Sequence, residues 1–137
     1  MKNININGIK FHHVGIIVSC IEEAIKNYSI IGGTESISET FLIDSQKVKV
    51  CFVKTSKDIY LELVEPLADN LPLNKLMKKG INYYHTGYKV YSIEQTINTL
   101  ESYGYKFLTP FRSEAFNMKE CVFAYSPDLI LFEFIEL

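Results

Sequence analysis

The chain has 137 residues, of which 47% are hydrophobic and 22% charged; this is typical of one globular domain and excludes a disordered segment. The net charge is −2 and Arg112 is the only arginine, so we expect no nucleic-acid partner. The three cysteines lie far apart and no apolar run is long enough to cross a bilayer. These features predict a cytoplasmic protein without a disulfide framework or a membrane segment.

The first half of the chain predicts one helix and four strands. A short β-branched strand is expected at residues 11–18. Ser19, followed three residues later by Glu22, resembles a capping box, and the helix that it opens is expected to stop at Gly32-Gly33. The remaining strands of this half are expected at about 35–43, 47–54 and 58–65.

The second half repeats this order after a linker at residues 67–81. Pro72 and Gly80 predict a short helix within the linker. A strand at 83–90 then leads to a helix that begins at Ser92 and ends at Gly104. The last strands are expected at about 105–111, 119–125 and 129–136.

The two halves are an internal repeat. At an offset of 72 residues the pairs His13/His85, Gly15/Gly87, Val18/Val90, Ile21/Ile93, Glu22/Glu94 and Gly32/Gly104 coincide. Glu62 and Glu133 lie 71 residues apart, each inside an apolar strand. We therefore predict an α+β fold of two βαβββ modules, at about 9–66 and 82–137, within a single domain spanning 1–137.

The repeated histidines and glutamates predict a metal site. A lone histidine in a strand is more often a hydrogen-bonded core residue than a ligand. A buried carboxylate is costly without a cation, however, and one divalent ion would neutralise both glutamates. Two imidazoles and two carboxylates suit Zn, Ni, Co, Mn or Fe. Four protein ligands leave two octahedral positions open, which favours a catalytic site over a structural one.

Four segments in order resemble the vicinal oxygen chelate superfamily. This superfamily includes glyoxalase I (lactoylglutathione lyase), methylmalonyl-CoA epimerase, extradiol dioxygenases and bleomycin resistance proteins. The matching segments are Phe11–Ile16, Leu61–Leu67, Tyr84–Tyr88, and Ser126–Asp128 with Leu131–Phe134. The resemblance covers residues 9–137, is closest to the epimerase and glyoxalase I branch, and implies a glyoxalase-like fold with a curved eight-stranded mixed sheet.

The resemblance implies a metal-dependent isomerase or lyase. Its ligands would be His13, Glu62, His85 and Glu133, and Glu133 would also carry the proton. The reaction would remove a proton next to a carbonyl of a thioester or hemithioacetal, through a metal-stabilised enolate or enediolate. Ser45 stands where epimerases carry a second glutamate. We expect a homodimer with a small-molecule substrate, its site closed within one chain or between exchanged modules.

Other polar residues are weaker candidates. Gln46, Tyr60 and Arg112 are possible substrate contacts, although Tyr60 could equally pack in the core and a surface ion pair is the commoner role for Arg112. Glu65 and Glu136 are interpreted as solvated or paired with lysine.

Two alternative functions stay open. One is a metal-free, ligand-sequestering protein of the bleomycin resistance type, a class that usually lacks the full set of four ligands. The other is a non-haem iron dioxygenase, in which Glu62 would crowd the open metal positions.

Overall fold

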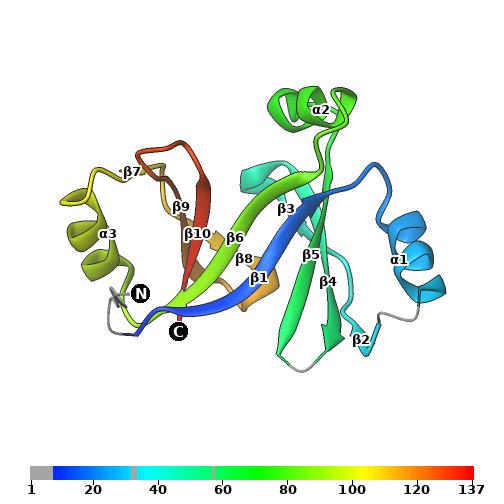
Figure 1. Cartoon of the computed structure of the whole chain (residues 1–137), viewed down its shortest axis with the longest axis horizontal. Helices are drawn as coiled ribbons and strands as arrows, with labels where there is room; N and C mark the ends of the chain where they lie inside the picture. Colours follow the sequence, from blue (N-terminus) through cyan, green and yellow to red (C-terminus); the bar gives the residue numbers. More distant parts are fainter. Residues whose placement is uncertain (1–7, 32–33, 57) are drawn as a thin grey trace. The chain divides into compact units, whose positions relative to one another are not determined.

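The computed structural model describes residues 8–31, 34–56 and 58–137 (Figure 1). The chain divides into two compact units. The N-terminal unit is His13–His85, and the C-terminal unit is Thr86–Leu137 together with residues 8–12. The module boundaries predicted at 66 and 82 stay predictions.

Among its described residues, the N-terminal unit contains two helices, four complete strands and parts of its first and last strands, whose other residues belong to the C-terminal unit. Its elements are β1 (Lys10–Ile17), α1 (Ile21–Ile30), β2 (Ser36–Ile37), β3 (Phe41–Ile43), the 3-10 turn η1 (Asp44–Gln46), β4 (Val48–Ser56), β5 (Ile59–Pro66), α2 (Leu71–Lys78) and β6 (Tyr83–Val90). The predicted linker helix is confirmed as α2, with Pro72 in its first turn and Gly80 just beyond its end at φ +77.

The C-terminal unit repeats this order with one helix. Its elements are α3 (Ile93–Glu101), β7 (Lys106–Phe107), β8 (Phe111–Ser113), the 3-10 turn η2 (Glu114–Phe116), β9 (Lys119–Tyr125) and β10 (Leu131–Glu136). None of the helices in the described ranges is long and apolar enough to span a membrane.

The strands form a mixed sheet in the order β2-β4-β5-β1-β6-β10-β9-β7, with β3 on β4 and β8 on β9. β1 runs parallel to β5 and β6 runs parallel to β10. The registers repeat as well, because Gly15 is opposite Glu62 and Gly87 is opposite Glu133. The predicted α+β class and the internal repeat are therefore confirmed.

The described residues contain ten strands rather than eight, because two predicted strands are broken. The strand expected at 35–43 is interrupted after Ile37, where the Ser38 hydroxyl accepts a hydrogen bond from the Phe52 N–H at 2.8 Å. A side-chain oxygen thus takes the place of a ladder carbonyl. The strand expected at 105–111 is interrupted before Phe111 by Pro110, which has no N–H to donate.

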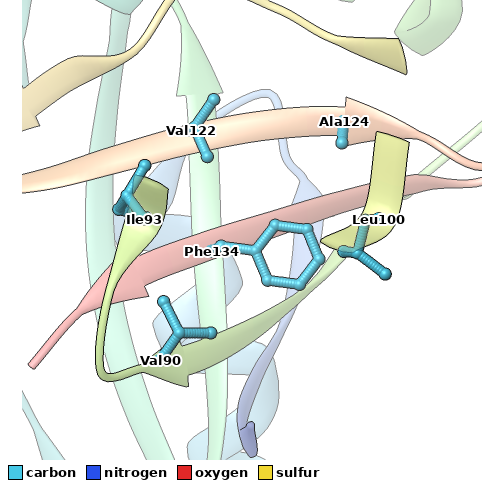
Figure 2. Packing of buried hydrophobic residues seen from close by; sticks show 6 residues of the cluster. All are labelled: Val90, Ile93, Leu100, Val122, Ala124 and Phe134. Atoms are coloured by element: carbon cyan, nitrogen blue, oxygen red, sulfur yellow. The ribbon is translucent and has the colours of Figure 1, made fainter. Parts of the chain in front are cut away.

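In each unit one long helix, α1 or α3, packs on one face of the sheet. In the N-terminal unit, Ile21 and Ala24 of α1 pack on Cys51, Val53 and Leu63. Figure 2 shows the corresponding core of the C-terminal unit, with the Phe134 ring among side chains of α3 and the strands. Its buried members are Val90, Ile93, Leu100, Val122, Ala124 and Phe134. Because side chains alternate along a strand, Glu62 and Glu133 face away from the helix of their own unit.

The start of each long helix is held by a glutamate from a distant strand. The Ile21 N–H donates to Glu65 Oε1 at 2.8 Å, and the Ile93 N–H donates to Glu136 Oε1 at 3.0 Å. The interpretation of these glutamates as solvated or lysine-paired did not include this capping role. The predicted start of the second long helix at Ser92 is confirmed, since Ser92 is its N-cap and the Ser92 hydroxyl accepts a hydrogen bond from the Gln95 N–H.

The predicted cap at Ser19 is wrong. Helix α1 begins one residue later than that prediction requires, with Cys20 as the N-cap and no hydrogen bond from the Cys20 side chain. The predicted stop at Gly32-Gly33 lies outside the described residues.

We expect Glu65→Ala to lower the free energy of unfolding by about 1 kcal/mol, because it removes a carboxylate acceptor at the N-terminus of α1. Urea unfolding followed by circular dichroism measures the change. Ser19→Ala is the matched control and should leave the free energy within about 0.5 kcal/mol of the parent value. An equal loss in both variants would contradict the assignment of the cap to Glu65.

Candidate metal centre

Three buried side chains converge in the N-terminal unit. His13 lies on β1, Glu62 on β5 and His85 on β6, and their exposed fractions are 0%, 5% and 1%. The His13 Nε2 and His85 Nε2 atoms are 3.0 Å apart. Glu62 Oε1 lies 3.2 Å from His85 Nε2 and 3.6 Å from His13 Nε2. The structure therefore brings together three of the four predicted ligands.

The register of β1 and β5 places the first two residues on one face. His13 is opposite Tyr60 and Gly15 is opposite Glu62, so His13 and Glu62 are diagonal neighbours on adjacent parallel strands. Strand alternation turns Leu61 and Leu63 to the other face, toward α1. Glu62, which lies between these two leucines, therefore projects toward the histidines and not into the apolar core beneath α1.

Gly15 makes room for the side chain of His85. A Cβ atom at this position would lie 2.5 Å from His85 Cε1 and 2.7 Å from His85 Nδ1. Any larger residue would push the imidazole ring out of its place beside His13. The repeated glycine of the sequence thus has a steric role in the site.

We expect Gly15→Ala to weaken divalent-metal binding by about 10–100-fold, because the buried His85 ring must move to admit the methyl group. Competition with a chromophoric chelator measures the affinity. Gly80→Ala is the control, since its Cβ would meet nothing within 4 Å and only its positive φ is strained. That variant should lose stability but keep its metal affinity, and equal affinity in both variants would contradict the steric role of Gly15.

The geometry of the three residues fits a divalent ion. Ligand atoms about 2.1 Å from one ion are about 3.0 Å apart at right angles and about 3.4 Å apart in a tetrahedron. The three observed separations of 3.0, 3.2 and 3.6 Å are close to this range. Without a cation, one Nε2 atom must carry a proton to face the other nitrogen at this distance. The group could hold a metal ion through nitrogen and oxygen donors.

Aromatic rings flank both histidines. The Phe52 ring meets the His13 ring edge-on, with centroids 5.5 Å apart, and the Tyr84 ring lies 4.6 Å from the His85 ring. Phe52 is also opposite Glu62 in the β4–β5 ladder. These rings restrict the imidazoles and lower the local dielectric, which strengthens the electrostatic interactions of charged ligands.

Glu133 belongs to the C-terminal unit. It lies on β10, is 4% exposed, and is opposite Gly87 on one side and Phe123 on the other. Glu62 has the same neighbours in its own unit, Gly15 and Phe52. The place of Glu133 in the ligand set and its catalytic role stay predictions.

The three predicted substrate contacts have different surroundings. The backbone carbonyl of Gln46 accepts a hydrogen bond from Asn70 Nδ2 at 3.2 Å. Tyr60 is half-buried on the face of β5 that carries Glu62. Arg112 is exposed on β8 and its Nη1 donates to the Met118 backbone carbonyl at 3.0 Å. Their roles toward a substrate stay predictions.

Lys54 is a further polar residue on the face of Glu62, opposite Tyr60 in the β4–β5 ladder, and it was not among the predicted site residues. The alternation of β4 could have found it, since Lys54 lies two residues from Phe52 and therefore on the same face.

Residues 12–125 match the family described as the Glyoxalase/Bleomycin resistance protein/Dioxygenase superfamily. The chain belongs to this superfamily. The match spans most of the chain and confirms the resemblance carried by the His13, Glu62 and His85 segments. A comparison with curated protein sequences gave no match.

Several solved structures share this architecture. The hypothetical protein BH1468 from Bacillus halodurans C-125 is 26% identical, with a TM-score of 0.81 over 94% of each chain. Methylmalonyl-CoA epimerase from Mycobacterium tuberculosis is 21% identical, with a TM-score of 0.80 over 99% of this chain and 92% of that one. Streptomyces coelicolor methylmalonyl-CoA epimerase, in complex with 2-nitronate-propionyl-CoA, is 20% identical, with a TM-score of 0.80 over 95% of each chain. These similarities establish the glyoxalase-like α+β fold.

Proposed function

We propose that this chain is a divalent-metal-dependent enzyme that removes a proton from a carbon next to a carbonyl group. The proposed ligands are His13, Glu62, His85 and Glu133. The observation that carries the proposal is the convergence of two imidazole nitrogens and one carboxylate oxygen at 3.0–3.6 Å, all three side chains being buried. Such a group is costly to bury unless a cation or a proton is shared among its members.

Glu133 is the proposed base and fourth ligand. It occupies the position in the second repeat that Glu62 occupies in the first, including the glycine and phenylalanine partners. Its carboxylate would take the proton from the substrate carbon and return it to the same or the adjacent carbon. When bound, the metal ion would supply a Lewis acid for the substrate carbonyl.

The proposed substrate is a thioester or a hemithioacetal. Support comes from the superfamily and from the fold shared with epimerases, one of them in complex with a CoA ligand. Ser45, at the position of the second epimerase acid, is an exposed residue of η1. A hydroxyl there does not replace a carboxylate base, which favours reactions that need a single carboxylate, as in a lactoylglutathione lyase-like enzyme.

Metal analysis followed by deuterium wash-in tests this function. We expect the purified protein to bind a divalent ion and the loaded protein to exchange a substrate C–H with D₂O. NMR would follow exchange in methylmalonyl-CoA and in the glutathione adduct of methylglyoxal. Exchange that is absent with both substrates in the metal-replete protein would overturn the proposal.

A non-haem iron dioxygenase is a second candidate, because His13, His85 and Glu62 make up a two-histidine, one-carboxylate donor set. The Fe²⁺-loaded protein would then consume oxygen with a catechol, and the proton-transfer enzyme would not. A protein that binds no metal under any of these conditions would instead fit the ligand-sequestering class.

A further inference from the structure

A row of side chains crosses three strands of the N-terminal unit on the face of the metal centre. His13 of β1 is opposite Tyr60 of β5, and Tyr60 is opposite Lys54 of β4. Cross-strand partners project to the same side of a sheet. Neighbouring strands are about 4.8 Å apart, so the Cα atom of Lys54 lies about 10 Å from that of His13.

The Lys54 ammonium group is held over this row. Its Nζ lies 6.0 Å from the centroid of the Tyr60 ring, at the outer limit of a cation–π contact. The Lys54 side chain is only 27% exposed, which is low for lysine. The ammonium group therefore lies near Tyr60 rather than extending freely into solvent.

The acidic partner of Lys54 is a weak one. Glu35 Oε2 lies 3.9 Å from Lys54 Nζ, and the Glu35 side chain is 57% exposed. A solvated pair at this distance contributes little free energy. A second carboxylate arriving from the metal centre could therefore take the place of Glu35 at small cost.

We propose that Lys54 binds a carboxylate of the substrate and so selects an anionic carbonyl compound. This inference rests on the proposed function, because the metal-bound carbonyl fixes the other end of the substrate. The substrate chain crosses the Tyr60 ring, which lies between His13 and Lys54 in the row. The metal and its four ligands sum to about zero charge, so Lys54 supplies the positive charge that recognises the anion.

Two keto acids with the same metal-binding head test the inference. 2-Oxoglutarate and 2-oxopentanoate have equal chain length and differ only in the distal carboxylate. We expect the zinc-loaded protein to bind 2-oxoglutarate about tenfold more tightly by calorimetry, as one charge-assisted hydrogen bond would produce. Lys54→Met should reduce this preference to about twofold or less by weakening 2-oxoglutarate alone, without changing metal content.

Lys49→Met is the matched control. Lys49 lies on the same strand but on the opposite face, where it is exposed and opposite Glu65. This variant should keep the full preference for 2-oxoglutarate. A full preference in Lys54→Met would overturn the role of Lys54 and leave the metal site intact. If neither keto acid changes the visible absorption of the cobalt-loaded protein, the proposed metal function fails together with the inference.

Discussion

Glu133→Gln is expected to reduce metal-dependent exchange of the substrate C–H with solvent by about 10²–10⁴-fold, the usual contribution of a positioned general base. Glutamine is nearly isosteric with glutamate and keeps one oxygen as a metal ligand, but its amide does not accept a proton from carbon. Deuterium incorporation followed by NMR, normalised to bound metal, measures the effect. Normalising the rate to bound metal distinguishes the loss of the base from a loss of metal.

Glu136→Gln is the control for this experiment. Glu136 lies three residues further along β10 and accepts a hydrogen bond from the Ile93 N–H, which a glutamine oxygen can also do. The rate of substrate C–H exchange in Glu136→Gln should stay within about twofold of the parent rate. A Glu133→Gln protein that retains more than a tenth of the parent rate would show that another group carries the proton.

His85→Ala is expected to weaken divalent-metal affinity by more than about hundredfold, because it removes one of the two imidazoles of the centre. At a metal concentration that stabilises the parent protein by about 2.7 kcal/mol, a hundredfold excess over its dissociation constant, the variant should be stabilised by only about 0.4 kcal/mol or less. Competition with a chromophoric chelator and thermal unfolding with and without zinc measure the two effects.

His12→Ala is the control for that loss. His12 lies on β1 beside His13, but its ring contacts Phe116 at a centroid distance of 5.6 Å. Metal affinity should stay within about threefold of the parent, since this ring projects to the other face of the strand. Parent-like metal binding by His85→Ala would remove His85 from the ligand set.

The fold class and much of the site could be predicted because the signals are local and duplicated. A strand and helix that recur at a fixed offset identify the repeat without any tertiary information. The spacing of His13, Glu62 and His85 then suggests a common centre, and the cost of burying Glu62 adds a physical reason.

Features that depend on contacts between distant segments could not be predicted. The cap of α1 comes from Glu65, 44 residues from Ile21, while the nearby Ser19 offers a familiar local pattern that the chain does not use. The strand break at Ser38 likewise depends on Phe52, 14 residues away. The position of Lys54 opposite Tyr60 follows only from the β4–β5 register, which the sequence does not specify by itself.

The glutamates that hold α1 and α3 have a consequence for how this sequence can evolve. Glu65 lies three residues beyond Glu62, and Glu136 three residues beyond Glu133, so each pair projects to opposite faces of one strand. Inserting or deleting one residue between the members of a pair would send one acid to the wrong side. Length changes in related sequences should therefore accumulate in the hairpin turns that precede β5 and β10, where the two repeats themselves differ by one residue.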